Sequence, residues 1–308
     1  MLQIELAGLK LRNPLILASG ILGNSASLAL RIEEAGAGAY TTKTITKDAR
    51  PGYRNPSFVK LETGYLNAVG LANPGIDYFS EELDLMKKLL KIPVILSVGG
   101  KDLEEYEYVV KVGVEHGVDA FELNLSCPHV EKMGAELGED LEAAINIIRR
   151  VKAVAHGRPI FLKLSAHYNY LKLAEEAVRA GISGFTAINT LRGLAIDIYA
   201  RTPILSNIYG GYSGPGIKPI ALKVVYDLYE RFRNVPIIGV GGVDSWVSAL
   251  EMILAGASAV GIGSAIATKD LEVFREIIEG LRRYLETEGF RSIVELVGLA
   301  HEEVSNPY

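Results

Sequence analysis

Polar and reactive side chains stand at the carboxyl ends of several short apolar segments in this chain. One segment ends in Asn124-Leu-Ser-Cys127 and another in Thr41-Thr-Lys-Thr44, while Ser97, Lys163 and Asn189-Thr190 end three more. Such a gathering of ammonium groups, amides and a thiol favours an anionic ligand, because a buried lysine without a nearby carboxylate needs a negative partner. The pattern therefore predicts an anion-binding site at one end of an apolar core.

Cys127 is the only cysteine in the 308 residues, so neither an internal disulfide nor a cysteine-bound metal cluster is expected. A lone cysteine is most often a small buried hydrophobe. Its neighbours favour chemistry, because Pro128 stops regular structure after the thiol and two glycines in the segment 128–138 suit a flexible lid. A thiolate with a lowered pKa would serve as a base. No metal is expected, since the five histidines show no metal-ligand spacing.

Two glycine clusters end the last two apolar segments of the chain. They are Gly239-Val-Gly-Gly242 and Gly261-Ile-Gly-Ser-Ala265. In α/β barrels, the loops after the last two strands form a phosphate site from backbone N–H groups and a helix N-terminus. Together the clusters predict a phosphorylated cofactor, although each alone would also fit a tight turn.

A repeating unit of amphipathic helix, glycine-containing turn and short apolar strand must position these residues. Strands are expected at 14–19, 39–44, 93–98, 120–126, 159–165, 184–189, 236–241 and 259–263, and helices at 102–115, 140–155, 170–180, 219–232, 245–255 and 270–286. Eight strands alternating with helices predict a closed (β/α)8 TIM barrel. The alternative is an open doubly wound sheet, which usually carries a Gly-x-Gly-x-x-Gly turn after an early strand. Ala18-Ser-Gly-Ile-Leu-Gly23 resembles that turn only loosely.

One connection interrupts the repeat. About thirty residues rich in Gly, Pro, Asn and Tyr lie between Thr44 and a helix near Asp77. Ordered loops of this length are usually functional. This one would leave the barrel face on which active sites lie.

Length and composition set the class of protein. A hydrophobic fraction of 49% and a charged fraction of 22% are ordinary for a globular chain, and 308 residues suit a single barrel domain, 1–308. The net charge of −5 argues against a nucleic-acid or anionic-membrane partner, and no apolar run reaches the length of a membrane span. We expect a soluble, cytoplasmic protein.

Several of these motifs resemble dihydroorotate dehydrogenases of the soluble class 1 group. The most specific is Asn124-Leu-Ser-Cys-Pro128, which is similar to the family's catalytic Asn-(Leu/Ile)-Ser-Cys-Pro motif. Asn67-Ala-Val-Gly-Leu-Ala-Asn-Pro-Gly75 resembles the family's orotate-binding loop, and Asn189-Thr190 and Ser213-Gly-Pro215 are further matches. The resemblance runs from Leu11 to about Thr268 and is nearest to class 1B, the NAD-linked heteromeric kind.

The resemblance implies an FMN-dependent oxidation of dihydroorotate to orotate in pyrimidine biosynthesis. Cys127 would take the C5 proton of the substrate while the C6 hydride passes to FMN N5. FMN would be held by Ser19, Lys43, Thr44, Ser97, Asn124, Lys163, Ile188, Gly214, Gly241, Gly242, Gly263 and Ser264. The pyrimidine would be held by Lys43, Asn67, Ala68, Val69, Gly70, Leu71, Asn124, Asn189 and Thr190.

Class 1B also implies partners. The chain would form the homodimeric core of a heterotetramer with a second subunit, which carries FAD and a 2Fe–2S cluster and passes the electrons to NAD. The rival within the family is a homodimer like class 1A, which uses fumarate at the orotate site.

Two residues depart from the class 1B pattern. His129 follows the Cys-Pro pair where the family usually has Asn, and Ser97 stands where class 1B typically has Asn. Cys127-Pro-His129 with Lys132-Met-Gly134 resembles the pyrimidine domain of dihydropyrimidine dehydrogenase, which reduces uracil with the same barrel, FMN and cysteine. The loop 67–75 favours dihydroorotate, because uracil has no carboxylate to bind.

Two other classes of function would fit a barrel of this kind. One is a phosphate-binding carbon–carbon lyase that uses Lys163 as a Schiff base. The other is a non-catalytic barrel that only binds a partner. A flavin absorption spectrum would separate the leading hypothesis from both.

Overall fold

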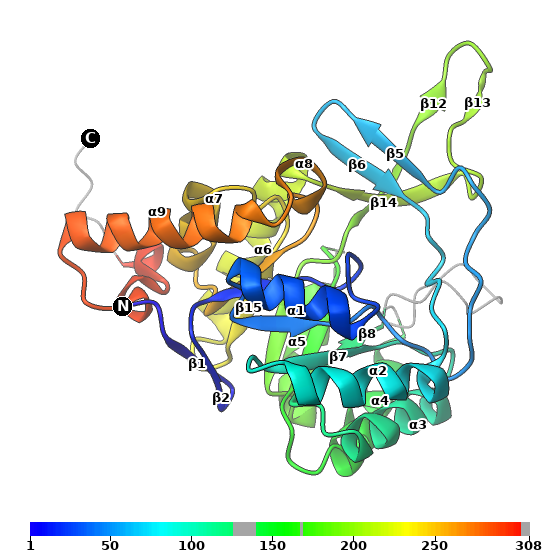
Figure 1. Cartoon of the computed structure of the whole chain (residues 1–308), viewed down its shortest axis with the longest axis horizontal. Helices are drawn as coiled ribbons and strands as arrows, with labels where there is room; N and C mark the ends of the chain where they lie inside the picture. Colours follow the sequence, from blue (N-terminus) through cyan, green and yellow to red (C-terminus); the bar gives the residue numbers. More distant parts are fainter. Residues whose placement is uncertain (126–139, 167–168, 303–308) are drawn as a thin grey trace.

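Eight parallel strands close into a barrel in the computed structural model, which describes residues 1–125, 140–166 and 169–302 (Figure 1). In their order around the barrel they are β3 (Leu15–Leu17), β4 (Ala39–Thr41), β7 (Val94–Val98), β8 (Ala120–Asn124), β9 (Ile160–Leu164), β10 (Gly184–Ala187), β15 (Ile237–Val240) and β16 (Ala259–Ile262). Strand β16 pairs with β3 and closes the ring. Every strand lies within a predicted segment. The TIM-barrel prediction is confirmed, and the open-sheet alternative is wrong.

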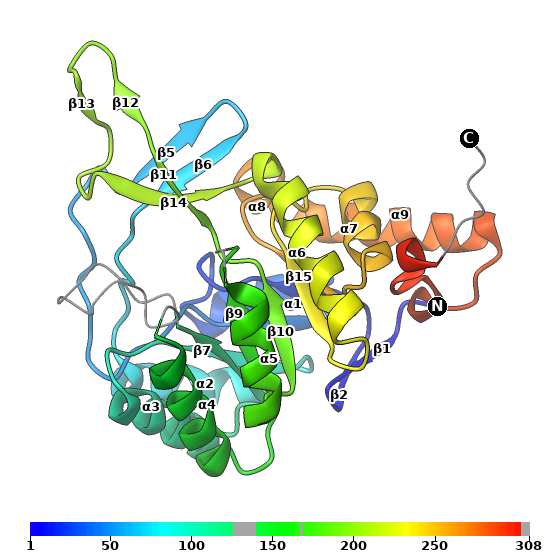
Figure 2. The ribbon, with the colours of Figure 1, turned by 180° about the vertical axis from the view of Figure 1, so that it is seen from behind.

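Helices follow the barrel strands and cover their outer face (Figures 1 and 2). They are α1 (Ala26–Ala35), α2 (Ile76–Leu89), α3 (Leu103–Glu115), α4 (Leu141–Val154), α5 (Tyr170–Ala180), α6 (Lys218–Arg231), α7 (Trp246–Leu254), the single turn α8 (Ile266–Lys269) and α9 (Glu272–Glu288). The Asp102 carboxylate accepts the Glu105 N–H at the start of α3, and Gly36 and Gly181 take positive φ at the ends of α1 and α5. These local signals explain why the predicted helix ends differ from the observed ones by at most two residues.

The barrel strands are buried on both faces, because side chains fill the barrel and helices cover it. Phe121, Phe161 and Phe185 lie on three neighbouring strands and are fully buried. Helix α3 packs so closely that a Cβ on Gly113 would lie 2.7 Å from Leu96 Cδ2. This packing fixes the carboxyl ends of the strands, where the predicted site residues lie.

A four-stranded antiparallel sheet is built from two insertions that follow the carboxyl ends of β4 and β10. Its strands are β5 (Phe58–Leu61), β6 (Gly64–Asn67), β11 (Leu191–Leu194) and β14 (Tyr209–Ser213), in the order β11-β14-β6-β5. Leu66, Ala68 and Leu205 form a small core beneath it. The expectation of a plain loop between Thr44 and Asp77 was therefore wrong for residues 58–67. A partner strand far along the chain makes this hairpin part of a sheet.

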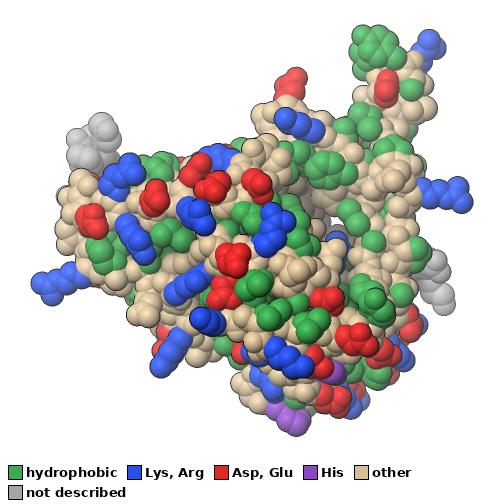
Figure 3. Space-filling model, viewed as in Figure 1, with side chains coloured by type: hydrophobic (Ala, Val, Ile, Leu, Met, Phe, Trp, Pro, Cys, Tyr) green, Lys and Arg blue, Asp and Glu red, His purple; other side chains and the backbone are tan. Residues whose placement is uncertain are grey.

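Smaller elements complete the described chain. An N-terminal hairpin, β1 (Ile4–Leu6) and β2 (Leu9–Leu11), lies away from the four-stranded sheet in both views, and the helical turns η1 (Pro215–Ile217), η2 (Ile293–Leu296) and η3 (Leu299–His301) follow later. A two-stranded arm, β12 (Ile196–Asp197) and β13 (Thr202–Pro203), projects beyond the sheet. Ile198 and Tyr199, between these two strands, are exposed. Figure 3 shows hydrophobic side chains at the end of the projecting arm. Among the described helices, none combines the length and the apolar character needed to cross a membrane.

Candidate functional site

Lys163 lies at the carboxyl end of β9, inside the mouth of the barrel. Its ammonium group donates to Ser19 Oγ at 2.6 Å, and its side chain is only 7% exposed. A carboxylate from the neighbouring strand β8, Glu122, lies 3.5 Å away and is 4% exposed. The expectation that the buried lysine has no carboxylate nearby was therefore wrong. Lys163 is compensated within the protein before any ligand binds.

Polar side chains link the ends of neighbouring strands across the barrel mouth. Ser97 Oγ donates to Glu122 Oε1 at 2.9 Å and lies 2.9 Å from Thr44 Oγ1. Asn124 Nδ2 donates to Thr44 Oγ1 at 3.2 Å. Asn189 Nδ2 donates to Asn124 Oδ1 at 3.3 Å. Four predicted site residues thus form one hydrogen-bonded chain that ends at Glu122, a residue the sequence reasoning missed.

Lys43 supplies a second ammonium group near this chain. Burial lowers the pKa of Lys43 below its usual value of 10.5, and the positive charge of Lys163 lowers it further. Within the described part of the chain, no carboxylate forms an ion pair with Lys43. A bound anion would relieve both effects, because an opposite charge favours the charged form of a lysine.

The glycine turn that follows β15 lies against the glycine turn that follows β14. Gly241 and Gly242 take φ values of 131° and 73°, and a Cβ on Gly242 would lie 3.0 Å from the carbonyl oxygen of Gly214. A Cβ on Gly241 would lie 3.5 Å from Ile188 Cγ1. Gly263 follows β16, the neighbour of β15 on the side away from β10, and the nearest atom to a Cβ on it is Ala18 Cβ at 3.7 Å. The fold thus brings these predicted cofactor residues to the same end of the barrel.

A cavity of about 250 Å³ lies between these turns and the β5–β6 hairpin. Gly242, Val243 and Ser264 line it, and within the described residues their backbone N–H groups donate to no acceptor. Unpaired N–H groups around a cavity suit a phosphate group. Helix α8 follows Ser264 but has only four residues, so the predicted contribution of a helix N-terminus is smaller than expected. The residues present fit the phosphate end of FMN.

The predicted substrate loop joins this arrangement from the four-stranded sheet. Asn67 Nδ2 donates to the carbonyl oxygen of Gly211 at 3.1 Å. A Cβ on Gly211 would lie 2.2 Å from Thr190 Oγ1, so Thr190 packs directly on this strand. Asn189, which precedes Thr190, then connects these substrate-side residues to Asn124 through its hydrogen bond. The structure brings the predicted substrate and cofactor residues together.

Asn73 organises the rest of the loop, although the sequence reasoning gave it no role. Its Oδ1 accepts the N–H groups of Thr46 and Gly75, and its Nδ2 donates to Thr46 Oγ1 and to the carbonyl oxygen of Leu71. The Asn-Pro-Gly sequence was the available signal, because Asn side chains often close such turns. Ala68, in contrast, donates its N–H to Ser57 at 2.7 Å, so that group is already occupied. Val69 and Gly70 lie between Ala68 and Leu71, and the Val69 carbonyl accepts the Tyr53 N–H at 3.2 Å.

Cys127 and the predicted lid segment 128–138, including His129, lie outside the described residues. The described chain stops two residues before the thiol, at Leu125, which is buried directly after β8. Among the described residues, no group of three or more His, Cys, Asp or Glu side chains is placed to hold a metal ion.

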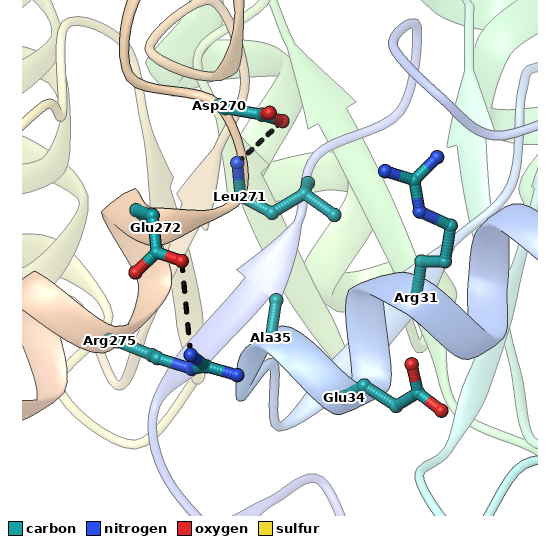
Figure 4. A pocket seen from close by; sticks show the side chains of 7 residues that line it. All are labelled: Arg31, Glu34, Ala35, Asp270, Leu271, Glu272 and Arg275. Atoms are coloured by element: carbon teal, nitrogen blue, oxygen red, sulfur yellow. Dashed lines mark hydrogen bonds and ion pairs between the residues drawn. The ribbon is translucent and has the colours of Figure 1, made fainter.

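A second cavity, of about 260 Å³, lies on the side of the barrel between α1 and the start of α9 (Figure 4). It is lined by Arg31, Glu34, Ala35, Asp270, Leu271, Glu272 and Arg275. Asp270 accepts the Leu271 N–H, and Glu272 pairs with Arg275 at 3.8 Å. It contains none of the predicted site residues. The barrel mouth is therefore the candidate site.

The arrangement at the mouth combines a place for a phosphate, a buried lysine beside a hydroxyl and a polar pocket that bears a second lysine. A sequence model of the dihydroorotate dehydrogenase family matches residues 1–285. The chain is 48% identical over 302 residues to the catalytic subunit of dihydroorotate dehydrogenase B (NAD(+)) of Pyrococcus furiosus, with 98% of this chain and 99% of that protein covered.

Catalytic subunits of the same name from other archaea are similarly close. The protein of Methanocaldococcus jannaschii is 43% identical over 306 residues, with 98% of this chain and 99% of that protein covered. The protein of Archaeoglobus fulgidus is 44% identical over 305 residues, with coverages of 97% and 99%. The chain thus belongs to the dihydroorotate dehydrogenase family, as its motifs predicted.

Proposed function

We propose that this chain oxidises dihydroorotate to orotate with FMN as its resident cofactor. One observation carries the proposal: the hydrogen bond from Asn189 to Asn124 joins the substrate-side residues to the cofactor-side residues in one pocket. A non-redox lyase or a simple binding barrel would not need both sets at the same mouth. The names of the archaeal relatives support the same activity.

The cofactor would lie across the strand ends. Its phosphate group would meet the N–H groups around Gly242 and Ser264, and the open space at Gly263 would allow close approach. Gly214 and Gly241 would shape the neighbouring turns, because a Cβ on either would meet protein atoms. The remaining contacts would come from Ser19, Lys43, Thr44, Ser97, Asn124, Lys163 and Ile188. When bound, FMN supplies the acceptor for the hydride. Lys163 would place a positive charge where reduced flavin gains negative charge.

The substrate would lie beside the loop 67–75. Lys43 would bind its carboxylate, because a charge-assisted hydrogen bond is worth about 1.5–3 kcal/mol. Asn67, Asn124, Asn189 and Thr190 would orient the ring through their polar groups, together with the backbone of Val69, Gly70 and Leu71. The Ala68 N–H would not contribute, because it already donates to Ser57. Cys127 would take the C5 proton as a thiolate. The segment 128–138 would then exclude water from the site.

Electrons would leave through a second subunit. The relatives are named catalytic subunits of an NAD(+)-linked enzyme, which implies a partner for them. The chain has one cysteine, so it cannot supply the several ligands of an iron–sulfur cluster. We infer a homodimeric core in a heterotetramer, whose other subunit carries FAD and a 2Fe–2S cluster.

The test begins with the purified protein. We expect flavin absorbance, and mass analysis of the released flavin should identify FMN. Orotate should perturb the flavin spectrum at concentrations at least tenfold lower than uracil does, because only orotate has a carboxylate for Lys43. A protein without flavin would refute the proposal. A preference for uracil would favour a dihydropyrimidine dehydrogenase activity, to which the Cys127-Pro-His129 sequence is similar.

The electron acceptor needs a separate assay. The isolated chain, given dihydroorotate, should reduce an artificial dye but neither NAD nor fumarate. Robust NAD reduction by the chain alone would contradict the partner. Efficient fumarate turnover would place the protein with the class 1A-like homodimers.

A further inference from the structure

Glu122 is a buried acid that none of the proposed binding roles uses. It lies on β8 with Asn124 two residues later, so the two side chains point to the same face of the strand. Its register partner on β7 is Ser97, which donates to Glu122 Oε1 at 2.9 Å. Its side chain is 4% exposed, and the Lys163 ammonium lies 3.5 Å away. A carboxylate so deeply buried is costly unless charged and polar neighbours compensate it.

The contacts of Glu122 determine the direction of every hydrogen bond in the chain across the barrel mouth. A carboxylate beside an ammonium group only accepts, and a serine hydroxyl has one hydrogen to give. Because Ser97 gives that hydrogen to Glu122, Thr44 must donate to Ser97. Thr44 then accepts from Asn124 Nδ2, which turns Asn124 Oδ1 toward Asn189. The direction runs from Asn189 to Glu122 without a break.

We infer that Glu122 is a positioning residue for the proposed reaction. Its carboxylate holds Lys163 on one side and, through Ser97 and Thr44, sets which way the Asn124 and Asn189 amides face on the other. An amide turned the wrong way would present a donor where the pyrimidine needs an acceptor, or the reverse. Ser97 suits this role because a hydroxyl accepts and donates at a single atom. This inference rests on the proposed function, since it concerns how the same pocket recognises its ligands.

The experiment compares Glu122→Gln with Ser97→Ala, the double variant and a matched control. Glu122→Gln keeps the shape but removes the charge, and its amide no longer enforces the direction of the chain. Ser97→Ala cuts the chain but leaves the Lys163–Glu122 pair. Glu33→Gln is the control, because Glu33 is also a buried glutamate, and its carboxylate accepts a hydrogen bond from the Lys91 N–H at 3.0 Å. Lys91 precedes β7, so this control lies at the opposite end of the strands.

Three quantities are measured on the FMN-loaded and apo proteins: the Kd for orotate from the flavin spectrum, the Kd for FMN from fluorescence quenching, and the midpoint potential of the flavin. Glu122→Gln should raise the orotate Kd about tenfold or more. It should also raise the midpoint potential, because Lys163 then bears an uncompensated positive charge that favours reduced flavin. Ser97→Ala should raise the orotate Kd and leave the potential near that of the wild type. Glu33→Gln should change none of the three.

The double variant separates positioning from a general structural role. If Glu122 acts on the amides through Ser97, the orotate Kd of the double variant should match that of the more damaged single variant, because the second change interrupts a chain already broken. Independent, multiplying effects on the orotate Kd would overturn the inference. So would a Glu122→Gln protein whose orotate Kd and potential match those of Glu33→Gln.

Two further comparisons keep the test decisive. If Glu122→Gln does not fold, Glu122→Asp keeps the charge but withdraws the carboxylate by one methylene, and a wild-type orotate Kd in that variant would overturn the inference. If the wild-type protein carries no flavin or does not respond to orotate, the proposed function fails before any variant is compared. A responsive wild type with an unremarkable Glu122→Gln variant would refute only the positioning role.

Discussion

Gly263 offers a way to separate the needs of the fold from the needs of the cofactor. It follows β16 directly, and a Cβ built on it meets only Ala18 Cβ, at 3.7 Å, which is ordinary van der Waals contact. Its backbone does not take the positive φ that disfavours side chains. The protein itself therefore has room for an alanine there. If FMN fills this space, the methyl group would displace the cofactor and nothing else.

The magnitudes follow from these contacts. Gly→Ala at a compatible site stabilises a fold by about 0.4–1 kcal/mol, because the unfolded chain loses freedom. In a domain of this size, that corresponds to a rise in Tm of about 0.5–1.5 °C. The Kd for FMN should rise at least tenfold, which is a loss of about 1.4 kcal/mol of binding free energy. The variant should thus be more stable as apoprotein and weaker as flavoprotein.

Thermal unfolding of the apoprotein and fluorescence titration with FMN measure the two effects. Gly242→Ala is the contrast, because its φ is 73° and its Cβ would lie 2.7 Å from Lys218 Cβ. That variant should lose both stability and FMN affinity. Wild-type FMN affinity in Gly263→Ala would refute the placement of the cofactor over this strand end. A large loss of apoprotein stability would refute the reasoning about space.

Three other predictions concern the substrate side. Lys43→Met should raise the Tm of the apoprotein at pH 7, because the lowered pKa of Lys43 means that its charge destabilises the fold. This gain in Tm should shrink as the pH approaches 10.5, where the unfolded chain also loses this proton. The same variant should bind orotate at least tenfold more weakly. Cys127→Ala should keep FMN but slow flavin bleaching by dihydroorotate about 10²–10⁴-fold in stopped flow, and Cys127→Ser should be slightly faster at high pH. A near-normal rate in Cys127→Ala would mean that the thiol only contributes to packing. Asn73→Ala should raise the orotate Kd at least tenfold with little change in the Kd for FMN, since the side chain anchors only the loop. Equal losses of affinity for orotate and FMN in the spectral titration would contradict this prediction.

The barrel was predictable because its signals are local. Each strand is a short apolar run, and glycines such as Gly36 and Gly181 mark the helix ends beside it. The residues at the strand ends then follow from the closed topology, which brings all carboxyl ends to one face. Lys163, Asn124 and Asn189 could therefore be grouped without a structure.

What escaped prediction depends on distant partners. The hairpin of β5 and β6 becomes part of a sheet only because β14 pairs with it, and nothing near residues 58–67 indicates that partner. The role of Glu122 was not predicted for a different reason, because the sequence Ala-Phe-Glu-Leu-Asn is typical of one buried apolar strand. Its spacing of two residues from Asn124 was the signal that both side chains share a face. Its pairing with Lys163 depends on the neighbouring strand and needed the structure.

The sheet formed by β5, β6, β11 and β14 also imposes an order on the making of the protein. Asn67 bonds to Gly211, 144 residues later in the chain. A ribosome must therefore have released most of the barrel strands before β6 meets its partner. Contacts between such distant residues form slowly, because a long loop must close first. The substrate loop therefore cannot acquire its final shape before β14 has been made, and a nascent chain that ends before residue 209 would contain much of the barrel but no finished substrate pocket.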